Sequence, residues 1–177
     1  MKRKLSGIFL CSLASTVFLL SCQKEISNGD DSAIPSIANS SSAREDHARP
    51  FKGTYTTTNQ VLQGPPFLQQ RITGNGNATH LGESMFVALA TLNLNTPPPF
   101  GIMGTTVFTA DNGDEFYTQF TGTSTPIRNG QSAIVVTHEI TGGTGRFKIA
   151  HGTFVGNAIA NPAASTGSIS YIGTLTY

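Results

Sequence analysis

Residues 104–123 read GTTVFTADNGDEFYTQFTGT, with two segments rich in Thr, Val, Phe and Tyr on either side of residues 111–114, DNGD. These residue types are enriched in β-strands. The Asn-Gly pair is a strong hairpin signal, because both residues tolerate the positive φ angles that a tight turn requires. The stretch therefore predicts two antiparallel strands, 104–110 and 115–123, joined by a hairpin turn.

The second of these segments also indicates which of its faces lies inside the fold. Successive side chains of a strand point to opposite faces, so Phe116 and Phe120 share one face with Thr118, and Glu115 and Tyr117 share the other. The two phenylalanines favour the first face as the interior, which makes Glu115 and Tyr117 a surface pair. The opposite assignment stays open, and it would place the carboxylate of Glu115 in an internal pocket.

The same rhythm extends over residues 51–177, where Gly or Pro interrupts β-rich segments about every eight to twelve residues. No window shows a sustained helical period. Residues 96–99, TPPP, predict a loop because proline cannot donate to a sheet ladder. The other predicted strands are 52–58, 71–73 with 77–81, 84–94, 132–141, 152–160 and 167–177. About eight strands at this spacing predict an all-β, antiparallel sandwich or barrel.

The amino terminus has the pattern of a bacterial lipoprotein signal. Basic residues at positions 2–4 precede a mostly apolar stretch, 5–20, and Leu19-Leu20-Ser21-Cys22 resembles a lipobox. We expect residues 1–21 to be the signal peptide and Cys22 to carry the lipid that anchors the protein to a membrane. An ordinary cleaved signal with an incidental cysteine, or an uncleaved anchor, is the alternative.

Residues 22–50 are rich in Ser, Asn, Asp and Ala, and predict a flexible tether without a core of its own. The short run Gln23-Lys24-Glu25, followed by Asp30-Asp31, resembles the export tag of surface-exposed bacterial lipoproteins, although a solvated polar linker would look the same. The expected location is the bacterial cell envelope, as an outer-membrane lipoprotein. Which side of that membrane the domain faces stays open.

The expected barrel domain, 51–177, has no cysteine and a balanced charge. It carries five basic residues and five acidic ones, without a basic cluster, which argues against binding of nucleic acid. The absence of cysteine excludes thiol catalysis, disulfides and thiolate zinc sites in this domain. So few charges leave much of the exterior uncharged, and such surfaces often form interfaces, so we expect a homo-oligomer.

One motif resembles a known family. Residues 140–147, ITGGTGRF, with Ala150-His151-Gly152, are similar to the signature of dirigent proteins, and allene oxide cyclase barrels have a similar Gly-Gly-x-Gly segment. The terminal strand 173–177, GTLTY, also suits the last strand of such a barrel. The resemblance implies an eight-stranded antiparallel barrel of calycin type, often trimeric, whose central cavity receives a small, mostly apolar organic molecule. The catalytic residues of these families do not carry over, so no catalytic residue is assigned.

The motif also has a structural role of its own. Its glycines permit a sharp turn, Arg146 can reach backbone carbonyls or a carboxylate near one end of the barrel, and Phe147 would plug that end. A phosphate cradle would require a helix after the glycines, whereas a strand is predicted there. We therefore favour a turn and a plug, and retain Arg146 and Phe147 as candidate ligand-binding residues together with His138 and Glu115.

His138 is the candidate with the clearest orientation. It shares a strand face with the apolar Ile134, Val136 and Ile140, and therefore faces the interior. A buried neutral imidazole is favoured over a catalytic base. His80 and Glu83 are metal-ligand types, but two residues on one short segment do not complete a coordination sphere. No metal or other cofactor is predicted, and no nucleophile elbow or dinucleotide fingerprint is present.

Three functions remain open at this stage. The first is a membrane-tethered module that binds a small apolar molecule in the barrel. The second is a non-catalytic structural or adhesion protein with a solid barrel core. The third, ranked behind these, is an isomerase-like, cyclase-like or dirigent-like enzyme that steers a reactive intermediate in the pocket.

Overall fold

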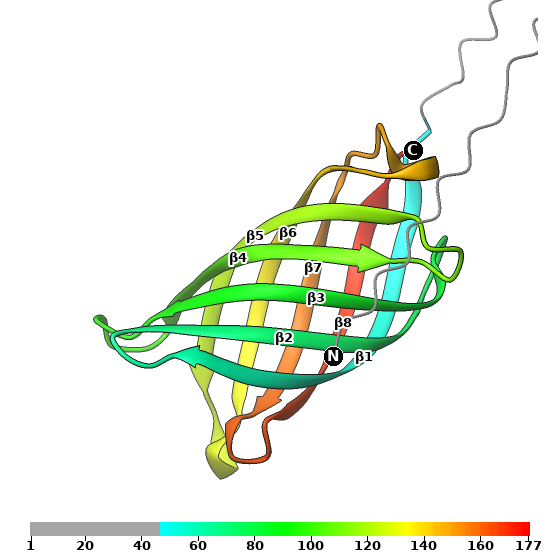
Figure 1. Ribbon diagram of the computed structural model, residues 1–177. Helices are drawn as coiled ribbons and strands as arrows, with labels where there is room; N and C mark the ends of the chain where they lie inside the picture. Colours follow the sequence, from blue (N-terminus) through cyan, green and yellow to red (C-terminus); the bar gives the residue numbers. More distant parts are fainter. Residues whose placement is uncertain (1–46) are drawn as a thin grey trace, which may run out of the picture. The chain divides into compact units, whose positions relative to one another are not determined.

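The computed structural model describes residues 47–177, in which eight antiparallel strands close into one barrel (Figure 1). The strands are β1 (Arg49–Gln63), β2 (Phe67–Ala78), β3 (Gly82–Asn93), β4 (Phe100–Thr109), β5 (Glu115–Pro126), β6 (Ser132–Gly143), β7 (Thr153–Asn161) and β8 (Thr166–Leu175). Each strand pairs with the next, and β8 pairs with β1 from Arg49–Leu175 to Thr58–Thr166. The prediction of an eight-stranded antiparallel barrel is confirmed.

The predicted signal peptide, Cys22 and the predicted tether up to residue 46 lie outside the described residues. The barrel itself begins at Arg49, where the first residues of β1 pair with the end of β8, rather than near residue 51. Among the described residues, no helix has both the length and the apolar character needed to cross a membrane.

The predicted connections are also confirmed. Residues 111–114 join β4 to β5, with the N–H of Gly113 donating to the carbonyl of Ala110 at 3.0 Å and with φ of 85° at Gly113. The side-chain amide of Asn112 accepts from the N–H of Asp114 at 3.1 Å and donates to its carboxylate at 2.9 Å. Residues 96–99 lie in the loop between β3 and β4.

Strand β2 differs from the prediction, which divided it at the glycines. It runs without a break through Gly74 and Gly76, because other groups occupy the space where side chains would be. The ring of Phe86 lies where a side chain of Gly74 would project, and the backbone of Thr54 and Tyr55 approaches Gly76 closely. Glycine in a strand interior often marks such a close approach, and here it lets the barrel wall curve tightly around its core.

Alternation along β5 and β6 agrees with the sequence pattern. Phe116, Thr118 and Phe120 are buried in the interior, whereas Glu115 and Tyr117 are only partly covered on the outer face. On β6, the buried positions are Val136, His138 and Ile140. The assignment of Glu115 to an internal pocket is therefore excluded, and the surface assignment is confirmed.

One end of the barrel is packed with aromatic rings. Five phenylalanines are fully buried there: Phe51, Phe108, Phe116, Phe147 and Phe154. Phe108 stacks on Phe116 at 4.6 Å between ring centroids, and Phe147 meets Phe116 edge-on at 5.6 Å. Phe147 comes from the turn η2 (Gly145–Phe147) that caps this end, so the predicted plug is confirmed. We call this the closed end.

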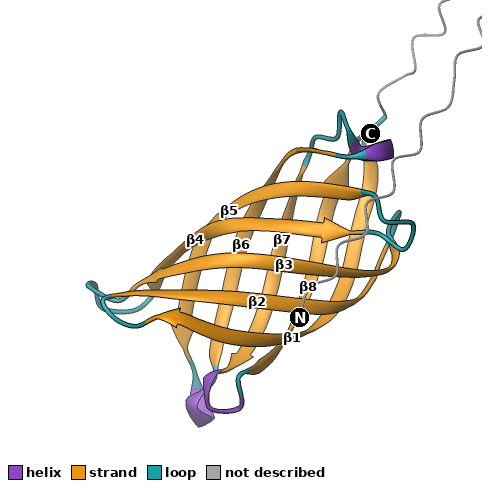
Figure 2. Ribbon diagram, in the orientation of Figure 1, coloured by secondary structure: helices purple, strands orange, loops and turns teal. Residues whose placement is uncertain are grey.

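The opposite end carries two further 3-10 turns, η1 (Arg128–Gly130) and η3 (Pro162–Ala164). Figure 2 shows these turns at the far end of the barrel from η2, with the strands running between them. The β1–β2 and β3–β4 connections lie at this end as well, because neighbouring antiparallel strands alternate in direction. We call it the open end, for the reason given below.

Candidate ligand-binding cavity in the barrel

The interior is hollow near the open end. Beyond the aromatic core lies a partly enclosed cavity of about 260 Å³ that opens at a mouth between η3 and the β1–β2 connection. Ligand pockets for drug-sized molecules usually measure about 300–1,000 Å³, so this cavity suits a small molecule. Its apolar lining includes Ile72, Phe86, Ala88, Leu92, Ile102, Phe120, Ile134, Val136, Ala158 and Ile169, and its polar lining includes Thr57, Asn59, Gln70, Thr106, Ser124, Ser132 and His138.

Side-chain size explains why only this half of the interior is open. Inward positions at the closed end carry Phe51, Phe108, Phe116 and Phe154, whereas inward positions nearer the open end carry mostly aliphatic residues, with small ones among them: Ala88, Ala158, Ser124 and Ser132. Close packing of the rings leaves no comparable space at the closed end. The cavity is therefore a consequence of the order of large and small residues along the strands.

His138 forms part of the floor of the cavity. Its ring stacks on Phe154 at 4.7 Å with an interplanar angle of 9°, and lies against Phe120 at 5.0 Å. Nδ1 of His138 and Oγ1 of Thr118 are hydrogen-bonded at 2.9 Å, while no hydrogen bond among the described residues involves Nε2. Burial lowers the pKa of His138 from 6.5 to about 3, so the imidazole is neutral near pH 7.

Two other polar groups in the cavity wall have no hydrogen-bond partner among the described residues. These are Oδ1 of Asn59, on β1, and Oγ1 of Thr106, on β4, and both atoms are buried. Thr106 pairs with Thr118 across the β4–β5 ladder, which places it beside the hydroxyl that binds His138. Asn59 lies nearer the mouth, where its N–H donates to the carbonyl of Ser165 at 2.8 Å. The floor of the cavity therefore presents Oγ1 of Thr106, and the wall near the mouth presents Oδ1 of Asn59, each without a hydrogen-bond partner among the described residues.

Of the four predicted ligand-binding residues, only His138 lines the cavity. Arg146 and Phe147 lie at the closed end, and Glu115 is on the outer face of β5, where it accepts from the hydroxyl of Tyr117 at 3.2 Å. Tertiary structure therefore separates residues that the motif and strand patterns had suggested as one set. Sequence patterns did not predict Asn59 and Thr106 as site residues. Each lies an even number of positions from an inward aromatic residue on its strand, Tyr55 for Asn59 and Phe108 for Thr106, so the two-residue period of a strand could have placed both inside.

Arg146 takes the structural role that its motif predicted. Its Nη2 donates to the carbonyl of His80 at 2.8 Å, its Nε lies 3.7 Å from the carboxylate of Asp114, and its guanidinium covers the ring of Phe147. The hydrogen bond from the side chain of Asn112 and that from the backbone N–H of Arg146 together hold the pKa of Asp114 below its usual range. Arg146 therefore ties the β2–β3 and β4–β5 connections to the plug.

The Arg146→Ala substitution should lower the free energy of unfolding by only about 1 kcal/mol, because the ion pair is exposed and such pairs contribute little. It should leave ligand occupancy of the cavity unchanged, since Arg146 lies at the other end of the barrel. Urea unfolding and a native mass spectrum of the same preparation would measure both quantities. Loss of bound ligand at unchanged stability would contradict this assignment.

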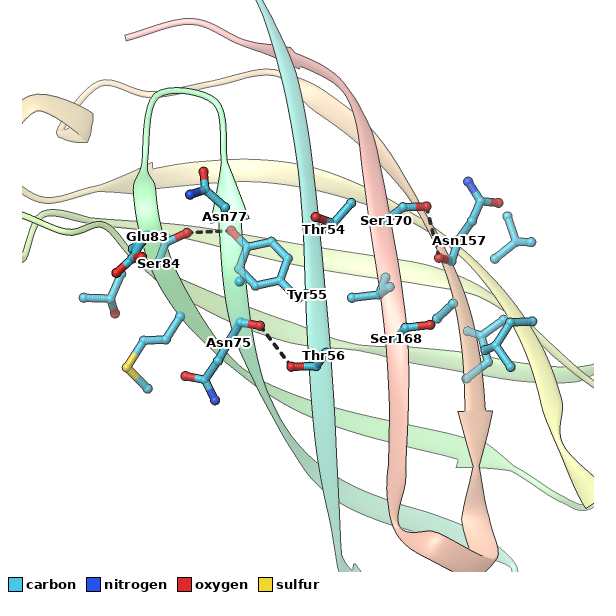
Figure 3. Close-up of a pocket in the computed structure, with 18 of the residues that line it drawn as sticks. Thr54, Tyr55, Thr56, Asn75, Asn77, Glu83, Ser84, Asn157, Ser168 and Ser170 are labelled. Atoms are coloured by element: carbon cyan, nitrogen blue, oxygen red, sulfur yellow. Dashed lines mark hydrogen bonds between the residues drawn. The ribbon is translucent and has the colours of Figure 1, made fainter.

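A larger concavity, about 1350 Å³, crosses the outside of the barrel (Figure 3). Hydroxyl and amide side chains of β1, β2, β7 and β8 line it, among them Thr56, whose hydroxyl donates to the carbonyl of Asn75 at 3.3 Å. This surface is open to solvent, so its polar groups are hydrated without a ligand. The interior cavity is smaller but more enclosed, and the unpartnered buried atoms of Asn59 and Thr106 belong to its lining, so it is the better candidate site.

Residues 47–177 contain no group of three or more His, Cys, Asp or Glu side chains that could hold a metal ion. Within this range His80 faces the start of β1 instead, with its Nε2 3.1 Å from the carbonyl oxygen of Pro50. Comparison of the chain with models of protein families, with curated proteins and with solved structures finds no match.

Proposed function

We propose that this protein is a membrane-tethered lipoprotein whose barrel binds a small, mostly apolar molecule that carries a hydrogen-bonding group. The observation that supports this most directly is the partly enclosed interior cavity with two buried, unpartnered oxygens, those of Asn59 and Thr106. A buried polar atom without a partner costs about 1–3 kcal/mol. A guest that donates a hydrogen bond to Asn59 or Thr106 would remove that cost, and the apolar walls would accept the remainder of the guest.

The chemistry of the lining favours an uncharged guest. No Asp, Glu, Lys or Arg lines the cavity, and its two titratable residues, His138 and Tyr171, are both neutral near pH 7 because burial lowers the pKa of the first and raises that of the second. An ionised guest would leave its charge unpaired in a poorly solvated site. Burial of apolar surface would provide most of the affinity, and the polar groups would orient the guest.

The cavity favours binding over the two alternatives. Its volume of about 260 Å³ exceeds a few water volumes, about 30 Å³ each, which argues against a solid structural core. General acid–base catalysis requires groups whose pKa values lie near the working pH, and His138, at about 3, does not meet that requirement. The resemblance to dirigent proteins and allene oxide cyclases agrees with a cavity for an apolar molecule, and the resemblance of residues 19–22 to a lipobox agrees with a membrane tether.

The test is a native mass spectrum of protein purified from a bacterial envelope without denaturation, compared with the spectrum after unfolding. We expect a bound species of low mass in the folded protein. The Ala158→Phe substitution should abolish it, because residue 158 faces the cavity between Ile134 and Ile169 and a benzyl group there would fill the space. Asn157→Phe, on the outer face of the same strand, is the matched control and should retain the bound species.

Equal amounts of the bound species in the Ala158→Phe and Asn157→Phe variants would contradict the proposal. A native mass spectrum of the wild-type protein that shows no bound alcohol after incubation with small alcohols would also contradict it. Circular dichroism of each variant should show the same β-structure, which separates a blocked cavity from a misfolded barrel. Intrinsic tryptophan fluorescence cannot report binding, because the chain has no tryptophan.

A further inference from the structure

Charge is distributed unevenly between the two ends of the barrel. All acidic residues of the described range 47–177 lie on the connections or strand segments of the closed end: Glu83, Asp111, Asp114, Glu115 and Glu139. The segments that form the open end, 59–71, 90–103, 121–136 and 158–169, contain no acidic residue and only two basic ones, Arg71 and Arg128. The open end is therefore weakly cationic and otherwise uncharged.

Large apolar side chains are exposed around the mouth of the cavity. On the β1–β2 side, Val61 is 59% exposed, Leu62 49% and Phe67 45%; beside η1, Ile127 is 42% exposed. Val61 also lines the cavity, so the exposed apolar surface continues into the interior. Figure 1 shows the β1–β2 connection and η1 at two separate corners of this end. Leu62 lies beside the first and Ile127 beside the second, so exposed apolar side chains lie at both corners.

From these observations we infer that the open end docks on the surface of a lipid bilayer containing anionic headgroups. Leu62, Phe67 and Ile127 would enter the interfacial region, and Arg128, next to Ile127, would lie at the level of the lipid phosphates. Apolar burial and attraction of basic residues to an anionic surface both favour this contact. An acidic residue at this end would oppose it, and none is present in the segments named above.

This inference extends the proposed function, since a cavity that opens on the bilayer can exchange an apolar guest with it without passage through water. The predicted lipid anchor is compatible with this orientation. Strand β1 starts at the closed end, and about 27 residues separate Arg49 from Cys22, an extended reach of up to about 90 Å. The 15 residues of β1 span at most about 50 Å, so the open end can turn toward the membrane that holds the anchor.

A labelling experiment on the predicted mature chain, residues 22–177, tests which end contacts the bilayer, because the apolar stretch 5–20 would itself enter vesicles. In a Cys22→Ser background, single cysteines at positions 62, 127 and 149 would each carry an environment-sensitive nitrobenzoxadiazole label. Ile149 is the matched control, because it is 67% exposed but lies at the closed end. With vesicles of equal parts phosphatidylcholine and phosphatidylglycerol, the fluorescence emission of the labels at 62 and 127 should shift to shorter wavelengths. The emission of the label at 149 should not shift.

Three variants provide the energetic test. Leu62→Asp combined with Ile127→Asp should abolish the shift of a label at position 67, whereas Ile149→Asp should preserve it. Arg128→Gln should weaken binding to these vesicles about fivefold, and less to vesicles of phosphatidylcholine alone. Equal shifts at 62 and 149, or no shift at either, would overturn the inference. A shift that needs no vesicles would identify a second copy of the chain as the occupant instead and would also overturn it.

The outcome is separable from that of the ligand test. If the open end does not dock, the native mass spectrum should still show the bound species, because Leu62 and Ile127 do not line the cavity. If the cavity binds nothing, the labels at 62 and 127 should still report contact with the bilayer.

Discussion

Acidification from pH 6.5 to pH 3 is expected to destabilise the barrel by up to about 5 kcal/mol through His138 alone. Burial lowers the pKa of this residue to about 3 in the folded protein, from 6.5 in the unfolded chain. The unfolded chain therefore binds a proton at a pH where the folded one does not. The stabilisation is complete above pH 6.5 and is lost as the pH falls toward 3, by about 1.4 kcal/mol per pH unit.

The surroundings of His138 offer no compensating charge. Its ring contacts Phe108, Phe120, Phe154 and Tyr171, and its hydrogen bond is to the neutral Thr118. Tyr171 titrates only well above pH 10 and does not contribute in this range. An imidazolium at this position would therefore be buried without a counter-ion.

Urea unfolding at several values between pH 7 and pH 3.5 would measure this effect. The His138→Phe variant is the comparison, because it retains an aromatic ring against Phe154 and removes the titrating group. We expect its stability to fall much less with acid than that of the wild type. All other residues are the same in the two proteins, so their contributions cancel in the difference. Parallel pH profiles for the two proteins would show that His138 is not the buried neutral group described above.

The second large effect should come from Phe108. This side chain is fully buried and contacts rings of β1, β3, β5, β7 and β8, including Phe116 at 4.6 Å and Phe51 at 6.4 Å. Phe108→Ala should lower the free energy of unfolding by about 3–5 kcal/mol, because the ring's transfer energy is lost and rings on several strands cannot all move to close the cavity.

The matched control for Phe108→Ala is Phe67→Ala at the open end, where the ring is half exposed; its cost should be under about 1 kcal/mol. Denaturant midpoints of the two variants, measured at neutral pH, would give the comparison. Similar losses in both would mean that the aromatic cluster does not dominate the stability of the barrel.

Local sequence patterns predicted much of the fold because a strand has a simple two-residue period. The phase of Phe116 and Phe120 assigned the inner face of β5 correctly, and the phase of Val136 and Ile140 placed His138 inside. The Asn112-Gly113 pair located the β4–β5 hairpin. Each of these inferences depends only on neighbouring residues, whose relation is set by backbone geometry.

The errors occurred where distant strands decide the outcome. The break predicted in β2 at Gly74 and Gly76 ignored the ring of Phe86 and the backbone of β1, which occupy the missing side-chain space. The candidate site combined His138 with Arg146, Phe147 and Glu115 because they were the chemically distinctive residues of neighbouring segments. In the structure His138 lies on the floor of the cavity, and Arg146 and Phe147 lie in the turn at the closed end. Glu115 lies on the outer face, as the alternation along β5 had indicated.

The amino-acid sequence by itself determined the β-strands, their inner faces, one decisive hairpin and the plug at Phe147, because these follow from period, turn chemistry and the burial of aromatic surface. Only the tertiary structure decided that the interior is half filled, that Asn59 and Thr106 remain without partners, and that the uncharged apolar end surrounds the mouth. Those properties arise from the register in which eight strands close, which brings together residues far apart in the chain.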